Sequence, residues 1–371
     1  MSDASSLETA PVRSNRSRQI AVLLATLGLG IAIFLAWPSS IDPVSWEVPP
    51  AQAFEGPLAV NQDLASAKRI IEGTFVGPED VDVDSQGRVY AGLADGRIIR
   101  LERDGTVTDW CHTQGRPLGM DFDADGNLVV CDAVRGLCRI DPAGKLTTLV
   151  PADGPVKLGF TDDCEIAGDG VIYFSDASDK YGVGYYMEDL MEARPHGKLL
   201  AYDPKTGKTT VLLDMLYFAN GVAVADDDSF VLVNETYRFR VIRYWLKGDK
   251  KGESEVFIEH LPGYPDGISS SPRGTFWIAL FTVRNPTADA LATKPWIRAQ
   301  MVKLPPALLP KPVDYGLIIE VDSNGRTIRS MHDPSGKTIA NVTSVHEEKG
   351  KLYLGNLLKN YVGALDLPLT P

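Results

Sequence analysis

The chain has 371 residues, 44% of them hydrophobic, and its 37 Lys and Arg against 49 Asp and Glu give a formal net charge of −12. This hydrophobic content can fill a large core and excludes wholesale disorder, while the acidic balance, with no clustered basic face, argues against a nucleic-acid partner. Four Cys in so long a chain exclude a disulfide scaffold, and no Cys-x-x-Cys pair indicates a zinc module.

The N-terminal region predicts a membrane helix. Residues 20–37 form an uncharged apolar run of 18 residues, which as a helix reaches about 27 Å, close to the thickness of the hydrocarbon layer. Arg13, Arg16 and Arg18 precede this run, and no Lys or Arg follows it closely. The positive-inside rule therefore places residues 1–19 in the cytoplasm and the rest of the chain across the membrane.

The alternative for this region is a cleaved signal peptide. Such a peptide has a shorter apolar section and a small-x-small cleavage site close behind it. Residues 34–36 (Phe-Leu-Ala) make a poor site, and Ala51-Gln52-Ala53 lies far downstream. We therefore expect a single-pass signal anchor, followed by a Pro- and Ala-rich linker over residues 38–66 that tethers the folded body.

The remainder of the chain, residues 67–371, consists of one repeated unit. Short apolar stretches alternate with Asp- and Gly-containing turns, which is typical of antiparallel strands. Six four-stranded units of about 40 residues predict an all-β fold, the six-bladed β-propeller. The units open near Glu79, Gly119, Asp162, Asn220, Asp266 and Val342.

The last unit supplies only three evident strands, over residues 342–347, 351–356 and 361–366. A closed ring needs a fourth strand, because an unpaired edge exposes backbone hydrogen-bonding groups. We expect residues 68–75 to pair at the outer edge of the last blade and to close the ring.

Two units are longer than the others. The third holds an insertion over about residues 177–197 and the fifth one over about residues 282–314, both between the second and third strands. In an up-and-down blade this connection lies beside the start of the innermost strand. We therefore expect the insertions to form a shared lid over one end of the axis, the alternative being solvated excursions.

Cys131 and Cys138 flank Val134-Arg135 symmetrically and could face each other across a hairpin. A disulfide between them is one reading. Because cross-strand pairs are often misdirected for bridging, two buried free thiols are the alternative.

Polar residues recur where the innermost strands begin. Each one alone could be an ordinary turn residue, since Asn-Gly and Pro-Asp-Gly are common turn sequences. Together they would converge on the axis, where buried carboxylates repel one another unless a cation joins them. Their oxygens suit Ca²⁺ or another hard divalent cation, and the scattered His residues disfavour zinc or copper. The predicted metal ligands are Glu79, Asp162, Asn220 and Asp266.

Several segments resemble a known family. The sequence is similar to the strictosidine synthase-like branch of the six-bladed calcium propellers, which is related to gluconolactonases and paraoxonases and includes the adipocyte plasma membrane-associated protein family. The similarity covers about residues 70–367. The matching segments are 77–80, 218–221 and 263–268 at the metal site, and 294–297, 332–336 and 345–355 elsewhere.

The resemblance implies the same four metal ligands. By comparison with paraoxonases it also implies a second, structural cation at Asp80 and Asp163, although both residues could simply cap strands. The catalytic His pair of paraoxonases is absent, since the matching second-unit position is Leu118. Thr343 stands where strictosidine synthase has its Glu, which argues against the strictosidine-forming reaction.

The function that follows is a membrane-anchored, calcium-dependent hydrolase of a small-molecule ester or lactone on the extracytoplasmic side. The cation would polarise the carbonyl and activate water, and Asp266 or Glu79 would accept the proton. The alternative is a non-catalytic, calcium-stabilised binding propeller tethered to the membrane, because propellers host both roles.

Overall fold

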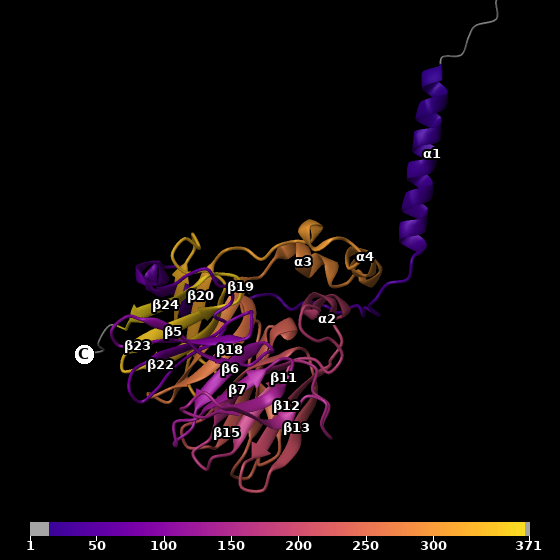
Figure 1. Cartoon of the computed structure of the whole chain (residues 1–371). Coiled ribbons are helices and arrows are strands. Elements are labelled where there is room, and N and C mark those ends of the chain that lie inside the picture. Colours follow the sequence, from indigo (N-terminus) through magenta and orange to yellow (C-terminus); the bar gives the residue numbers. More distant parts are fainter. Residues whose placement is uncertain (1–14, 368–371) are drawn as a thin grey trace, which may run out of the picture.

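Six four-stranded antiparallel sheets surround a common axis in the computed structural model, which describes residues 15–367. Figure 1 shows the blades side by side beneath three short helices, with a long N-terminal helix standing away from them. The predicted six-bladed β-propeller is confirmed. In each complete blade, consecutive strands pair as hairpins, so sequence order and spatial order agree.

The first three blades each use four consecutive strands, ordered from the axis outward. Blade 1 comprises β2 (Val81–Val83), β3 (Val89–Gly92), β4 (Arg97–Leu101) and β5 (Val107–His112). Blade 2 comprises β6 (Pro117–Phe122), β7 (Leu128–Asp132), β8 (Gly136–Ile140) and β9 (Leu146–Pro151). Blade 3 comprises β10 (Thr161–Ile166), β11 (Ile172–Asp176), β12 (Gly197–Asp203) and β13 (Lys208–Leu216).

The last three blades follow the same plan until the ring closes. Blade 4 comprises β14 (Ala219–Val224), β15 (Phe230–Glu235), β16 (Arg240–Trp245) and β17 (Ser254–Ile258). Blade 5 comprises β18 (Gly263–Ser271), β19 (Thr275–Val283), β20 (Gly316–Val321) and β21 (Thr327–Asp333). Blade 6 comprises β22 (Val342–Glu348), β23 (Lys351–Asn356), β24 (Tyr361–Asp366) and, from the start of the domain, β1 (Lys68–Glu72).

The ring closes by pairing the beginning of the propeller with its end. β1 runs antiparallel to β24, with Lys68 opposite Ala364 and Glu72 opposite Tyr361. Ile71 is buried among apolar residues of blades 1 and 6. This confirms the fourth strand expected from residues 68–75, and it covers an edge that would otherwise be unpaired.

Each sheet packs between two others, which explains the apolar runs of its inner strands. All six residues of β15 and of β20 are buried. A strand covered on both faces carries a nearly continuous apolar sequence instead of an alternating one. Outer strands such as β13 alternate more and face solvent.

The four cysteines are free thiols. In the register of blade 2, Cys131 lies opposite Leu137 and Val130 lies opposite Cys138. Neighbouring residues of a strand point to opposite faces of the sheet, so the two thiols belong to different layers. The disulfide reading is therefore wrong, and the free-thiol alternative holds.

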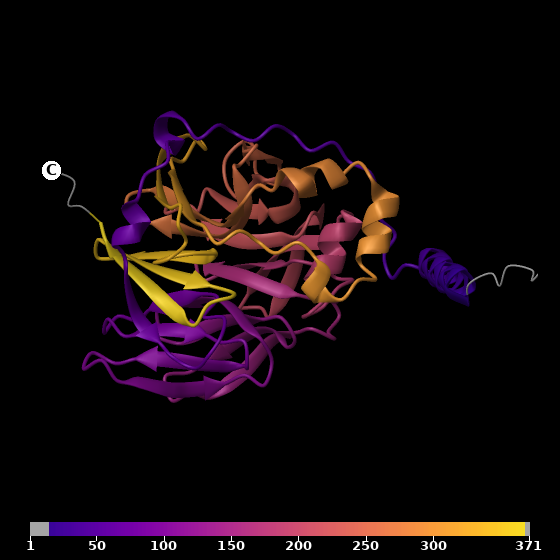
Figure 2. The ribbon, with the colours of Figure 1, turned by 90° about the horizontal axis from the view of Figure 1, so that it is seen from above.

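The two long insertions lie at the same end of the propeller, as expected, and we call residues 177–196 and 284–315 the roof. The first contains α2 (Tyr186–Glu192), and the second contains α3 (Pro286–Leu291), α4 (Pro295–Met301) and the 3₁₀ turn η4 (Pro306–Leu308). α2 and α4 are in contact although they come from different blades. Figure 2 shows these helices from above, grouped over one side of the ring.

Residues 38–66, which we call the strap, differ from the expected tether. Instead of hanging free, the strap packs along the roof and blades 4 to 6, and it includes η1 (Gly56–Leu58) and η2 (Asp63–Ser66). Leu64 is fully buried, and the backbone N–H groups of Val44 and Trp46 donate to roof carbonyls. The strap therefore belongs to the folded body.

α1 (Asn15–Ala36) precedes the strap and is long and apolar enough to cross a membrane. Its side chains make no buried contact with the propeller along the helix, and residues such as Leu23 and Leu29 are exposed. This agrees with the apolar run expected over residues 20–37. Residues 1–14, which contain Arg13 of the predicted cytoplasmic tail, and 368–371 lie outside the described residues.

Candidate metal centre and its cavity

A β-bulge at the axial end of each innermost strand positions the site. In blades 2 to 6 the pairing of the first two strands skips two residues, for example between Thr161 and Cys164 and between Ala219 and Val222. In blade 1 the backbones of Glu79 and Asp80 both pair with Gly92. A bulge bends its strand and re-aims side chains, so each blade turns two consecutive residues toward the axis.

These residue pairs sort into two layers. The first residues of the pairs are Glu79, Leu118, Asp162, Asn220, Asp266 and Thr343, and all except Thr343 line a cavity of about 620 Å³ under the roof, which we call the roofed cavity. The second residues are Asp80, Gly119, Asp163, Gly221, Gly267 and Ser344, and most of them line a smaller cavity of about 110 Å³, which we call the axial cavity. Glu79, Asp162, Asn220 and Thr343 of the first layer also border this smaller cavity.

The turn interpretation of the polar motifs is wrong for two of them. Asn220-Gly221 lies inside β14 and Asp266-Gly267 lies inside β18. Their glycines are needed for close packing around the axis: a Cβ on Gly221 would lie 2.3 Å from the backbone nitrogen of Ile268. Glycine is therefore required by blade-to-blade contact and not by a turn.

All four predicted ligands come together at the floor of the roofed cavity. Glu79, Asp162 and Asn220 are buried, and Asp266 is half-buried. Asn220 lies close enough to Asp266 to lower the pKa of its carboxyl group. Thr343, at the equivalent position of blade 6, donates from Oγ1 to the Glu79 carbonyl at 2.6 Å. That bond fixes blade 6 to blade 1 at the level of the floor.

The three carboxyl groups hold their protons more tightly than usual. Burial raises the pKa of Glu79 well above its ordinary value, and the charges of Asp266 and Asp162 raise it further. Burial and the charge of Asp266 act in the same way on the pKa of Asp162. Burial also raises the pKa of Asp266, to about 7, against the lowering effect of Asn220.

One guanidinium group, which the sequence analysis did not identify, lies beside these carboxylates. Arg116 is 7% exposed and lines the roofed cavity. Its Nη1 donates to the Gly77 carbonyl at 3.1 Å, whereas Nη2 is buried without a hydrogen-bond partner. Its charge lowers the pKa of both Glu79 and Asp162. Arg116 precedes the second innermost strand in an ordinary sequence context, so nothing in the sequence marked it.

The donor set fits a hard divalent cation. Three carboxylates and one amide offer oxygen ligands only, and a single guanidinium cannot neutralise the three carboxylates. Within residues 15–367, however, no three His, Cys, Asp or Glu side chains are close enough to hold an ion as they stand. Binding would therefore require Glu79, Asp162 and Asp266 to move inward, which their mutual repulsion opposes until a cation is present.

The axial cavity contains the two residues expected for a second cation. Asp80 Oδ2 accepts a hydrogen bond from the Met120 backbone at 2.7 Å, and Asp163 Oδ2 accepts one from the Val222 backbone at 2.8 Å. Each carboxyl group thus ties one blade to the next, which favours the strand-capping alternative, while the second cation stays a prediction.

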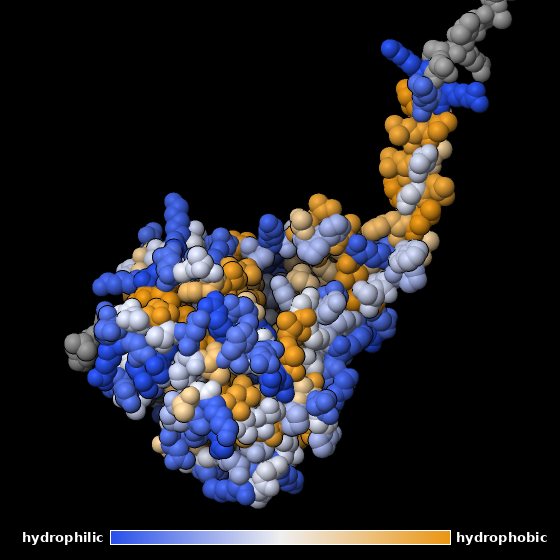
Figure 3. All heavy atoms as spheres, viewed as in Figure 1, coloured by the Kyte–Doolittle hydropathy of each residue, from blue (hydrophilic) through white to orange (hydrophobic). Residues whose placement is uncertain are grey.

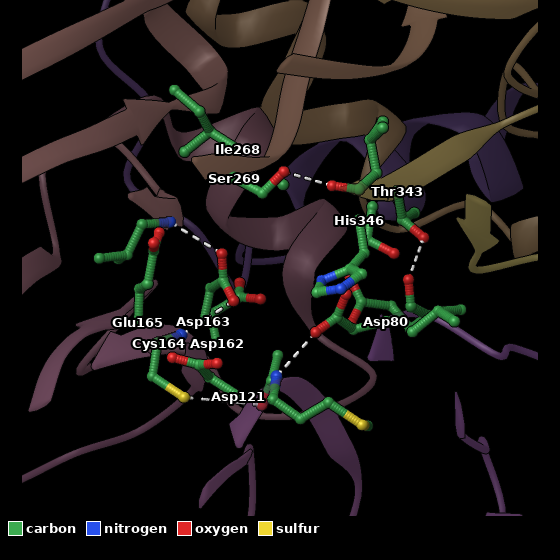
Figure 4. Close-up of a pocket in the computed structure, with 18 of the residues that line it drawn as sticks. Asp80, Asp121, Asp162, Asp163, Cys164, Glu165, Ile268, Ser269, Thr343 and His346 are labelled. Carbon is green, nitrogen blue, oxygen red and sulfur yellow. Dashed lines mark hydrogen bonds between the residues drawn. The ribbon is translucent and has the colours of Figure 1, made fainter. Parts of the chain in front are cut away.

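The same interblade pattern continues along the axis. Asp82, Asp121 and Glu165 accept backbone N–H groups of the following blades. Figure 4 shows carboxyl groups of three blades facing the axial cavity, with His346 of blade 6 beside Asp80. His346 Nδ1 lies 3.2 Å from Asp82 Oδ1, so this histidine belongs to the interblade network and lies outside the roofed cavity.

Aromatic side chains build the walls of the roofed cavity. The Phe218 ring stacks on Tyr237 at 4.7 Å between centroids, and Phe239 meets Tyr264 edge-on at 4.9 Å. Trp46 of the strap also lines the cavity. These walls are apolar, whereas the floor carries the ionisable groups, so the cavity offers a charged end to an apolar ligand.

Arg298 locks the roof in place. This buried α4 side chain donates to the carbonyls of Met191 at 2.6 Å and of Ala292 at 3.0 Å, and also to the carbonyl of Val44. One guanidinium group therefore joins both insertions to the strap. Because all three acceptors are backbone carbonyls, these hydrogen bonds depend on the fold of all three segments.

The fold defines the class of protein: a six-bladed β-propeller with a roofed axial cavity and an acidic floor. Comparisons with protein families then indicate the family: the strictosidine synthase model matches residues 162–249, and the strictosidine synthase-like N-terminal model matches residues 56–101. Adipocyte plasma membrane-associated protein of Bos taurus is 34% identical over 94% of this chain and 89% of its own length. Strictosidine synthase-like 4 of Arabidopsis thaliana is 34% identical over 84% of this chain and 85% of its own.

The chain therefore belongs to the strictosidine synthase-like family that includes adipocyte plasma membrane-associated protein, as its motifs indicated. Solved structures share the fold at low identity. A gluconolactonase of Xanthomonas campestris superposes with a TM-score of 0.60 at 18% identity, covering 90% of this chain and 99% of its own. A calcium-binding regucalcin of Agrobacterium tumefaciens superposes with a TM-score of 0.58 at 15% identity, covering 82% of this chain and 96% of its own.

The raised pKa values predict an unusual pH dependence of stability. In the metal-free protein, folded Glu79, Asp162 and Asp266 bind protons more tightly than their unfolded counterparts. The contribution of Asp266 to the free energy of unfolding is therefore present at low pH and lost as the pH rises through about 7. The contributions of Glu79 and Asp162 change with pH in the same direction. We expect the thermal midpoint of chelated protein to rise on acidification from about pH 7.5 to about pH 5.5.

Asp266→Asn and excess Ca²⁺ should each reduce this pH dependence, because neither an amide nor an ion-bound carboxylate takes up the proton. Asp104→Asn, at a fully exposed turn position, is the matched control and should leave it unchanged. Identical pH profiles for the chelated wild type and Asp266→Asn would contradict the electrostatic account.

Proposed function

We propose that this chain is a membrane-anchored hydrolase of esters or lactones that depends on Ca²⁺ or another hard divalent cation. The observation that carries the proposal is the convergence of Glu79, Asp162, Asn220 and Asp266 at the floor of a large apolar cavity beneath a roof. A charged floor and apolar walls suit a substrate with one polar carbonyl group and an apolar remainder.

The proposed roles follow from position and burial. Glu79, Asp162, Asn220 and Asp266 would hold the cation, which when bound polarises a carbonyl and lowers the pKa of a water molecule. Arg116 also lines this cavity, and its buried Nη2 has no hydrogen-bond partner; we assign to this guanidinium the role of donating to the substrate oxygen as negative charge develops.

Asp266 is the best placed of the four to move a proton. It is the half-buried member of the set, and burial brings its pKa to about 7. Once loosened from the cation, a carboxylate at this position would accept the proton of the attacking water and return it to the leaving oxygen. Glu79, the second candidate base, is more deeply buried.

The solved structures support the reaction class by analogy. One neighbour is named a gluconolactonase and another a calcium-binding protein, and each shares the fold of this chain. The analogy concerns fold, so the proposal rests on the cavity floor itself.

A binding propeller without catalysis is the competing function. The carboxylates stand too far apart to hold an ion without moving, and the name adipocyte plasma membrane-associated protein describes a location without naming a reaction. In that case the cation would stabilise the floor, and a ligand would fill the roofed cavity without being cleaved.

Metal analysis combined with an ester and lactone panel tests the proposal. Wild-type protein should bind one cation at the floor and hydrolyse at least one member of the panel, and a chelator should abolish turnover. Asp266→Asn and Glu79→Gln should each weaken cation binding and reduce kcat by about 10²-fold or more, the range of a lost acid–base or electrostatic group. Asp104→Asn is the control and should behave as wild type.

Tight cation binding without turnover on any ester or lactone would favour the binding propeller. Full turnover in the presence of chelator would contradict both the cation-dependent hydrolase and the non-catalytic binding propeller.

The placement of the domains is also a proposal. Residues 1–19 would be the cytoplasmic tail, residues 20–37 the membrane anchor, and residues 67–371 the propeller on the extracytoplasmic side, because Arg16 and Arg18 lie in the first turn of α1, before its apolar run. In sealed membranes, added protease should digest the propeller only when it has access to the extracytoplasmic face. Digestion from the cytoplasmic face would reverse the orientation.

A further inference from the structure

The membrane-spanning candidate ends directly against the roof. Lys303 follows α4, and its Nζ donates to the carbonyls of Phe34 at 3.1 Å and of Trp37 at 2.5 Å. These carbonyls belong to the last turn of α1 and the residue after it, where a cation is favoured. Figure 1 shows α1 rising from the corner of the molecule beside α4 and α2, with the roof on the same side.

The contact limits how far the roof can be from the bilayer. If α1 spans the membrane, its last turn lies at the membrane surface, and Lys303 holds the roof at that level. A free tether of the length of residues 38–66 could have kept the propeller far from the lipid. The strap instead packs on the body and leaves no such spacer.

The roof exposes apolar side chains on this side. Trp296 is 62% exposed and Leu308 is 67% exposed. Leu308 lies within a stretch rich in Pro and Leu, residues 304–313. Figure 3 shows hydrophobic residues at the top of the molecule, on the side from which α1 emerges. Exposed apolar patches of this kind mark contact surfaces, and Trp is typical of the membrane interface.

The charge of the same segment also favours a membrane surface. Residues 285–314, in the second insertion of the roof, contain four basic and two acidic side chains, 4 − 2 = +2, whereas residues 177–196 of the first contain two basic and four acidic ones, 2 − 4 = −2. The basic surface is therefore confined to the second insertion. Both acids are paired, Asp289 with Arg284 and Asp314 with Lys359. Lys294 and Lys311 are exposed and can face anionic lipid headgroups.

The roofed cavity opens on this face. Pro310 and Lys311 of the roof both line the cavity and are exposed. Three further lining residues are partly exposed and mark the mouth, namely Val183 at 42%, Tyr186 at 38% and Leu358 at 43%. A ligand dissolved in the bilayer could therefore pass from the lipid to the cavity along apolar side chains.

We propose that the roof rests on the bilayer surface and that the cavity takes from it an ester or lactone with a long hydrocarbon chain. The hydrocarbon chain lies along the aromatic walls, and the carbonyl reaches the acidic floor. This inference rests on the proposed anchoring and hydrolysis, and it adds the substrate class and the route of entry.

Depth-dependent quenching in vesicles tests the docking. The full chain is reconstituted in phosphatidylcholine and phosphatidylglycerol vesicles with an environment-sensitive fluorophore on Leu308→Cys, in a Cys111→Ser background because the other native thiols are buried. The matched control is Ile328→Cys, which is 46% exposed at the opposite end of the same blade. Lipids with nitroxide on their acyl chains should quench the probe at position 308 several-fold more than the probe at position 328.

Flotation and alkaline extraction of the same sample separate the two proposals. A chain that stays in the vesicles with equal quenching at both positions would overturn the docking and leave the anchoring intact. A blue-shifted but unquenched probe at position 308 would show a protein surface there, such as a second copy, and would also overturn it. If alkaline pH extracts the chain from the vesicles, the proposed anchoring and the proposed docking are both overturned.

The substrate class has its own measurement. Trp296→Asp with Leu308→Asp should lower the ratio of the hydrolysis rate of a vesicle-dissolved long-chain ester to that of a water-soluble acetate several-fold. An unchanged ratio would overturn entry from the bilayer. If neither ester is hydrolysed by the wild type, the proposed reaction fails, while the quenching result still decides the docking.

Discussion

Repulsion among buried carboxylates at the propeller axis is the constraint on which the candidate site depends. Glu79, Asp162 and Asp266 share one floor; burial raises the pKa of all three, and the charge of Asp266 raises those of Glu79 and Asp162 further. The fold accommodates them in the metal-free state by protonation and by the single cation Arg116. A divalent ion would satisfy the same charges with oxygen ligands, so cation binding and protonation compete for one set of side chains.

The blades impose this arrangement through a repeated irregularity. A bulge at the axial end of the innermost strands turns two consecutive residues inward, and the level of each residue decides its role. The upper residues face the roofed cavity, whereas lower residues such as Asp80 and Asp163 bind the backbone of the next blade. Two acidic residues that are neighbours in the sequence therefore have different roles: the first lies at the cavity floor, and the second holds two blades together.

Much of this could be predicted from the sequence, because strand and turn patterns repeat locally. The blades, the closing strand and the convergence of Asn220 and Asp266 follow from that repeat. Arg116 could not be identified, since an arginine before a strand carries no signal and only three-dimensional proximity gives it a role. The packing of the strap was also missed, because a Pro- and Ala-rich composition describes both a free linker and an extended segment held by roof carbonyls.

The roof and the strap cover the acidic floor with apolar side chains, next to the end of the helix that could span a membrane. The proposed function requires a cation at that floor. Crystals grown with Mn²⁺, which takes the oxygen ligands of Ca²⁺ and scatters anomalously, test this most directly. The account predicts one anomalous peak on the axis, at coordination distances of about 2.0–2.6 Å from oxygens of Glu79, Asp162, Asn220 and Asp266. An empty floor with these side chains still apart would contradict it.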